Sequence, residues 1–260
     1  MTADDDRWRR FEKTVADLHQ RFGIRVIGRA TRPAAPPVIP TGFPALDEAL
    51  GIGGLPRGRL SELVGVPTSG MATLALKVIT EAQAAAPDRL AAYLDLEKTF
   101  DPDYAARCGV DLARLLVVRP YTVRQGLTML PDFVFNGGFA ALVVDAPLQA
   151  VGAADTAEAL ADILARITAP LSRSAAALLF VSSLPLGSFP SIKSYPPHVP
   201  LPHFAAVRLM IRRERWLYHR RDVVGYAARL EVVKNRLAAV GHRADISITF
   251  NGTVRGEGMV

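Results

Sequence analysis

Three apolar runs, separated by segments with helical spacing, restrict the fold of this chain more than any other feature of its sequence. Residues 90–96, 139–144 and 175–181 are apolar almost from end to end, whereas a strand with one wet face alternates between apolar and polar. A helical pattern over residues 72–86 precedes the first run, and another over residues 153–168 precedes the third. Strands buried on both faces are typical of a parallel sheet covered by helices. The sequence therefore predicts an α/β fold with a mostly parallel sheet flanked by helices.

The C-terminal part has a different pattern. A proline-rich segment, residues 184–202, predicts a loop. Beyond it, residues 207–219 alternate, and residues 230–233 and 246–250 also have strand composition. This pattern predicts an antiparallel extension of the sheet.

The N-terminal part predicts a small helix-strand appendage. Its apolar residues are spaced by three and four positions, which places them on one face of a helix: Trp8, Phe11, Val15, Leu18 and Phe22. Residues 24–27 then alternate like a short strand, and residues 31–44 are rich in proline. We expect an appendage at residues 1–30, a linker at 31–44 and a core at 45–260. The apolar face must dock either on the chain's own core or on a neighbouring subunit.

Composition limits the class of protein and its partners. A chain of 260 residues with 50% hydrophobic and 22% charged residues is neither disordered nor a disulfide scaffold. The single cysteine, Cys108, the lack of a long apolar run and the acidic start without a secretory signal favour a cytoplasmic protein without a membrane partner. The net charge of +6 favours a polyanionic partner, although an arginine-rich genome would also produce it. No spacing of histidines with Cys108 predicts a metal site.

Residues 65–72 form the strongest candidate for a binding loop. Their sequence, Gly-Val-Pro-Thr-Ser-Gly-Met-Ala, lies between a predicted strand and a predicted helix. It has the frame of the phosphate-binding loop G-x-x-x-x-G-K-[ST]. Gly65 and Gly70, with Thr68 and Ser69 between them, would wrap backbone amides around an anion at the helix N-terminus.

The two side chains that give this loop its chemistry are replaced. Met71 stands where the motif has lysine, and Ala72 stands where it has the hydroxyl that binds magnesium. Thr73 comes one residue later, but one residue turns a helix by about 100°, so its hydroxyl faces another direction. Loss of both contacts predicts nucleotide binding weaker by on the order of 100-fold, and unaided ATP hydrolysis is not expected.

Further motifs stand in a fixed order along the chain. They are Ile39-Pro40-Thr41-Gly42, Gly53-Gly54-Leu55-Pro56-Arg57-Gly58-Arg59, Tyr93-Leu94-Asp95-Leu96-Glu97, Asp101-Pro102-Asp103-Tyr104-Ala105, Leu142-Val143-Val144-Asp145 and Val232-Val233-Lys234-Asn235-Arg236. Together with the loop, they resemble the bacterial RecA recombinase family over most of the chain. The resemblance implies a RecA-like core, and it implies that the N-terminal appendage docks on an adjacent subunit.

The resemblance also implies roles for single residues. Glu97 would activate the attacking water, and Tyr104, in the same segment as Asp101, would stack on adenine. Asp145 would face the metal at the end of a Walker B strand. Alternatively, these side chains are ordinary strand-end, capping or core residues. Lys234 and Arg236 would reach across a filament interface to a neighbour's nucleotide.

The chain departs from the family pattern in several places. Ser182 and Ser183 stand where the family has a sensor glutamine, and the two DNA-binding loops are altered. We also expect the family's C-terminal domain to be absent. Among RecA relatives, a chain of this length with a failed phosphate loop resembles the ImuA-type accessory proteins of damage-induced (SOS) mutagenesis. The resemblance implies an adaptor for a translesion polymerase or a recombinase filament.

Two functions remain open on the sequence. One is a non-hydrolysing adaptor, with no cofactor. The other is a DNA-dependent ATPase that binds ATP and magnesium in the degenerate site with a substitute cation, such as Lys98 or a neighbour's Lys234 or Arg236. In either case single-stranded DNA and further copies of the chain are candidate partners. A face of alternating arginines, or else a salt-bridged solvated face, is the candidate for phosphate contacts: Arg208, Arg212, Arg213 and Arg215.

Overall fold

The computed structural model describes residues 3–23, 36–185, 195–250 and 254–258. The chain divides into two compact units, Met1–Ala34 and Ala35–Val260. The first unit contains helix α1 (Ala3–Phe22), which ends at Gly23, whose φ is +89°. Among the described residues of this unit, Trp8, Phe11 and Phe22 are exposed on the helix. The predicted strand at residues 24–27 lies outside the described residues.

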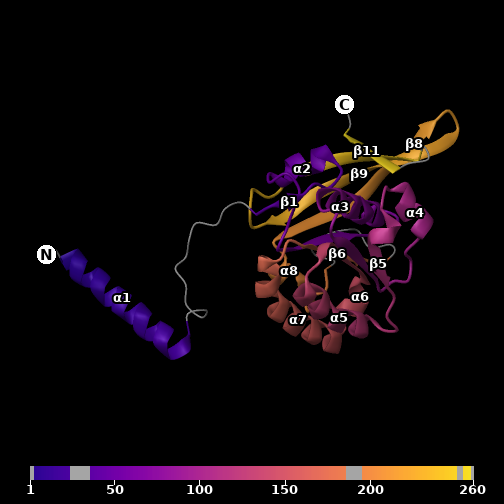
Figure 1. Ribbon diagram of the computed structural model, residues 1–260. Coiled ribbons are helices and arrows are strands. Elements are labelled where there is room, and N and C mark those ends of the chain that lie inside the picture. The colour runs from indigo at the N-terminus through magenta and orange to yellow at the C-terminus, as the bar shows by residue number, and fades with distance from the viewer. Residues whose placement is uncertain (1–2, 24–35, 186–194, 251–253, 259–260) are drawn as a thin grey trace. The chain divides into compact units, whose positions relative to one another are not determined.

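The second unit is built on a sheet of nine strands in the order β11-β10-β9-β8-β3-β7-β6-β4-β5 (Figure 1). The six strands from β8 to β5 run parallel, and β9, β10 and β11 are antiparallel to their neighbours. The predicted parallel sheet with an antiparallel C-terminal extension is thus confirmed. The strands are β3 (Leu60–Gly65), β4 (Leu90–Asp95), β5 (Leu115–Val118), β6 (Phe139–Pro147), β7 (Ala177–Ser183), β8 (Val207–His219), β9 (Asp222–Asn235), β10 (Arg243–Phe250) and β11 (Val254–Gly258).

Helices cover both faces of this sheet (Figure 1). Consecutive residues of β3 enter opposite sides of the core, since Leu63 packs in a cluster with α2 and α3 and Val64 in a cluster with α5 and α7. This two-sided burial explains why the central strands have no polar alternation. The helices are α2 (Pro44–Leu50), α3 (Met71–Ala85), α4 (Pro102–Arg107), α5 (Val123–Asn136), α6 (Leu148–Val151), α7 (Ala154–Arg173) and α8 (Leu201–Phe204), with a 3-10 turn at Leu112–Arg114.

The predicted linker at residues 31–44 overlaps the second unit. The short strand β1 (Val38–Ile39) pairs with β2 (Leu55–Pro56), and Ile39 and Phe43 are buried in the core. Pro44 begins α2, because proline is suited to the first turn of a helix, where its missing N–H has no intrahelical partner. Residues 36–44 are therefore part of the folded unit and not a spacer. In the described part of the chain, every helix is too short or too polar to cross a membrane.

Candidate functional site

The loop at residues 65–72 connects β3 to α3 through a tight turn. Thr68 and Gly70 have φ values of +66° and +107°, so two residues of the turn have a left-handed backbone conformation. A Cβ on Gly65 would lie 2.7 Å from Ser69 Oγ and 2.9 Å from the Ile211 carbonyl oxygen. The glycine is thus required by close approach, and the loop leads directly into the N-terminus of α3, where anions bind favourably.

The first turn of α3 presents no cation and no free hydroxyl. Met71 is 7% exposed and packs in the core beside the loop. Ala72 is exposed, and Thr73 is buried. The Thr73 hydroxyl lies 2.5 Å from the Tyr104 hydroxyl and 3.3 Å from the Tyr226 hydroxyl. Because these tyrosines engage it, Thr73 does not replace the hydroxyl lost at position 72.

A cavity of about 470 Å³ opens beside the loop, at the carboxyl ends of the parallel strands. It brings together most of the residues that the sequence proposed for a nucleotide site, which come from four elements or their ends: Thr68, Gly70, Met71, Ala72, Thr73, Glu97, Tyr104 and Asp145. Asp101 does not line it, because its carboxylate caps α4 by accepting from the amides of Asp103 and Tyr104. Tyr226 and Phe250 from the antiparallel strands complete the lining, and the sequence pattern did not identify them.

Three carboxylates gather at this end of the sheet. Glu97 accepts a hydrogen bond from Ser183, and Asp145 Oδ2 accepts one from Tyr93 at 2.6 Å. Asp95 is fully buried and accepts from the amide of Thr99 and from Arg119 Nε at 2.8 Å. Burial raises the pKa of Asp145 to about 6, the Tyr93 hydrogen bond opposes this rise, and the charges of Glu97 and Asp95 add to it.

This pKa predicts a pH-dependent cost of folding. A carboxyl group whose pKa is higher in the folded state than the ordinary 3.8 stabilises the fold at low pH, and that stability is lost as the pH rises from about 4 to about 6. Asp145→Asn should remove this decline, since the amide oxygen still accepts from Tyr93 but carries no charge. Urea unfolding at pH 4 and pH 7 measures it, and a variant with the same decline as the wild type would contradict the assignment.

Arg213 reaches the loop from the neighbouring strand. Its guanidinium donates to the carbonyl and hydroxyl oxygens of Thr68, each at 3.3 Å, and stacks 4.1 Å from the centre of the Trp216 ring. The parallel register of β3 and β8 pairs Gly65 with Ile211, which places the side chain two residues later beside the loop. A register between β3 and β8 is the signal that would have predicted this contact, and the linear sequence does not contain it.

The predicted arginine face is divided by the fold. Arg208 is 9% exposed and its Nε donates to the buried Glu62 at 2.5 Å, so the prediction that it contacts DNA is wrong. Glu62 also accepts from Tyr195 and Ser182, and the Arg208 guanidinium lies 4.6 Å from the Tyr195 ring centre. The other predicted contacts lie on the exposed half of β8, where Arg212 pairs with Glu214 at 2.7 Å: Arg212, Arg213 and Arg215.

Lys234 and Arg236 lie away from the loop of their own chain. The antiparallel register pairs Arg208 with Lys234 near the start of β8, whereas the loop lies near Ile211 and beyond. Lys234 Nζ donates to the Pro202 carbonyl oxygen and Arg236 to the His203 carbonyl oxygen, both at 2.6 Å. A contact with a nucleotide through these residues would have to involve a second subunit.

Comparison with known proteins identifies the family. The family model of the RecA N-terminal domain matches residues 9–255. The chain belongs to the RecA family. Proteins named RecA from Frankia alni and Paenarthrobacter aurescens are 34% and 35% identical to it over 275 and 276 residues, which are 99% of this chain and 79% of each relative. The RecA protein of Chloroflexus aurantiacus is 32% identical over 278 residues, 100% of this chain and 79% of the relative.

Family membership implies ATP and magnesium, and the loop does not fit them. The motif position for a lysine holds a buried methionine, and the position for the magnesium-binding hydroxyl holds a methyl group. The glycine frame and the carboxylates Glu97 and Asp145 remain at the cavity. The site keeps the frame of a RecA-type pocket, but it lacks the lysine that binds phosphate and the hydroxyl that binds magnesium.

Proposed function

We propose that this protein acts in DNA repair as a RecA-like adaptor that does not hydrolyse ATP. Two facts together support the proposal: Met71 is buried at the lysine position of the motif, and the Thr73 hydroxyl is already hydrogen-bonded to two tyrosines. Phosphoryl transfer depends on a cation and a metal that neutralise charge as it develops. With neither side chain present, binding of partners is the activity that this fold retains.

The proposed partners are single-stranded DNA and proteins of recombination or SOS mutagenesis. Arginines on the outer half of β8 and the apolar face of the amphipathic helix α1 support them. Arginines along one strand can follow a phosphate backbone, and an amphipathic helix can dock in an apolar groove. A recombinase filament or a translesion polymerase would be the protein partner, and a second copy of the chain would use the same helix.

A DNA-dependent ATPase is the second candidate. Glu97, Tyr104 and Asp145 line one cavity, which is the arrangement that hydrolysis would need. A substitute cation would then come from Lys98 or from Lys234 or Arg236 of a neighbouring subunit. This candidate requires a second subunit or a movement of Lys98 towards the phosphates.

Phosphate release in the presence of single-stranded DNA and Mg-ATP separates the two candidates. For the adaptor, we expect turnover of the wild type to equal that of Glu97→Gln, with and without DNA. Turnover that DNA stimulates and that Glu97→Gln abolishes would overturn the adaptor proposal. A parallel titration with a fluorescent ATP analogue tells whether nucleotide still binds without turnover.

A further inference from the structure

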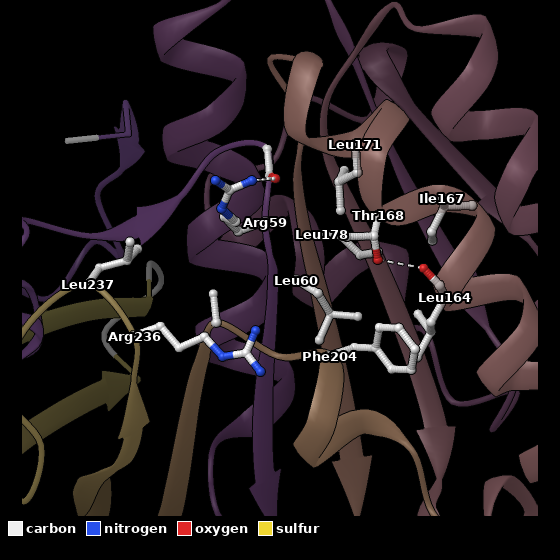
Figure 2. A pocket seen from close by; sticks show the side chains of 12 residues that line it. Arg59, Leu60, Leu164, Ile167, Thr168, Leu171, Leu178, Phe204, Arg236 and Leu237 are labelled. Atoms are coloured by element: carbon white, nitrogen blue, oxygen red, sulfur yellow. Dashed lines mark hydrogen bonds between the residues drawn. The ribbon is translucent and has the colours of Figure 1, made fainter. Parts of the chain in front are cut away.

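A second cavity lies at the opposite end of the parallel strands from the loop. It has a volume of about 320 Å³ and is bounded by the first residues of β3, the C-terminal half of α7 and the segment that follows β9. Its wall is mainly aliphatic, and Leu60, Leu171 and Leu178 are buried with 5% exposure or less. Phe204 closes one side (Figure 2).

Two guanidinium groups reach this cavity from one side, while Leu60, Leu178 and Phe204 lie on the other (Figure 2). Arg59 donates to the Gly58 carbonyl oxygen at 3.2 Å, and Arg236 donates to the His203 carbonyl oxygen at 2.6 Å. Among the described residues, neither forms an ion pair with a carboxylate. Each guanidinium carries five N–H donors, so donors remain on both.

The surroundings of the cavity make this end of the sheet positive. Lys234 lies close to Arg236, and its pKa is lowered by burial and then by the charges of Arg236 and Arg208. The residues that line the cavity include no aspartate or glutamate. An apolar hollow beside two uncompensated cations favours a ligand that is apolar at one point and anionic at the next.

We propose that this cavity binds a segment of a partner protein in which a large apolar side chain lies next to carboxylates. A guanidinium fork matches a carboxylate in two-point geometry, and a hollow of this size holds an apolar anchor of the kind that dominates protein interfaces. The cavity lies away from the phosphate loop of its own chain, and the inference does not rest on the adaptor proposal.

Fluorescence polarisation with two labelled peptides tests the proposal. One is Gly-Asp-Leu-Phe-Asp-Gly and the other is Gly-Asn-Leu-Phe-Asn-Gly, both amidated. We expect the wild type to bind the acidic peptide about tenfold more tightly, since a guanidinium forms stronger hydrogen bonds to a carboxylate than to a neutral amide. The double variant Arg59→Gln with Arg236→Gln should lose this preference, whereas Arg173→Gln, an exposed arginine that does not line the cavity, should keep it.

A matched pair of helix variants tests the cavity itself. Thr168 lines it and Ala169 does not, and both are exposed on α7. Thr168→Trp should fill the mouth and weaken peptide binding at least tenfold, and Ala169→Trp should bind as the wild type does. Equal binding of the two peptides, or unchanged binding to Thr168→Trp, would overturn the proposal.

The same titration identifies a competing occupant. If the site belongs to a second copy of the chain, peptide affinity falls as the protein self-associates, which light scattering at the same concentrations detects. That result would also overturn the proposal. Affinity that does not change with protein concentration supports a separate partner. ATP turnover that DNA stimulates would overturn only the adaptor proposal, so the two proposals can fail independently.

Discussion

The double change Met71→Lys with Ala72→Thr is expected to raise affinity for Mg-ATP by about 100-fold or more. It adds one charge-assisted contact to the phosphates and one ligand for magnesium, each worth roughly 1.5–3 kcal/mol. The rest of the pocket is in place, because Glu97 and Asp145 line the same cavity as the loop. Equilibrium titration with a fluorescent ATP analogue and magnesium measures the change.

The single changes provide the controls. Ala72→Thr alone restores a hydroxyl without a cation, so we expect a gain of about tenfold at most. Adding Asp145→Asn to the double variant should reduce its dependence on magnesium. A double variant that binds nucleotide no better than the wild type would mean that the tyrosines around Thr73 have closed the pocket to phosphates.

Arg208→Met is expected to lower the free energy of unfolding by about 3–5 kcal/mol. The substitution leaves the Glu62 carboxylate, whose side chain is 0% exposed, without its cation. Removal of one partner of a buried ion pair strands a charge in a medium that solvates it poorly, which is costly. Urea denaturation followed by circular dichroism measures the loss.

A surface pair on the same strand provides the comparison. Arg212→Met breaks the ion pair with Glu214, in which Arg212 is 41% exposed, and should cost less than about 1 kcal/mol. Combining Arg208→Met with Glu62→Gln should recover part of the stability, since no charge is then buried. An Arg208→Met protein as stable as Arg212→Met would show that water reaches Glu62.

The central strands could be predicted because burial on both faces leaves a direct mark on the sequence. Helix α5 could not, because Gly126 and Pro131 interrupt its pattern, and the helix is held by the packing of Leu127, Leu130 and other apolar residues. The same limitation applies to α2, where a proline that begins a helix has the appearance of a linker.

The residues around the loop were predictable to different degrees. Glu97 and Asp145 follow apolar strands directly, so their place at the carboxyl end of the sheet follows from topology. Arg208 and Arg213 lie on one strand, yet Arg208 is buried in an ion pair with Glu62 and Arg213 contacts Thr68. Which of them is buried depends on the register between strands more than 140 residues apart, and alternation along one strand cannot fix it.

Ser182 and Ser183, at the carboxyl end of β7, form hydrogen bonds on opposite faces of the sheet. Neighbouring residues of a strand point to opposite faces of the sheet, and Ser183 bonds Glu97 while Ser182 bonds Glu62. The cavity beside the loop and the hydrogen bond from Tyr195 to Glu62 therefore lie on opposite faces of the sheet and involve different side chains. A ligand in the pocket would therefore leave the hydrogen bond from Tyr195 to Glu62 unchanged.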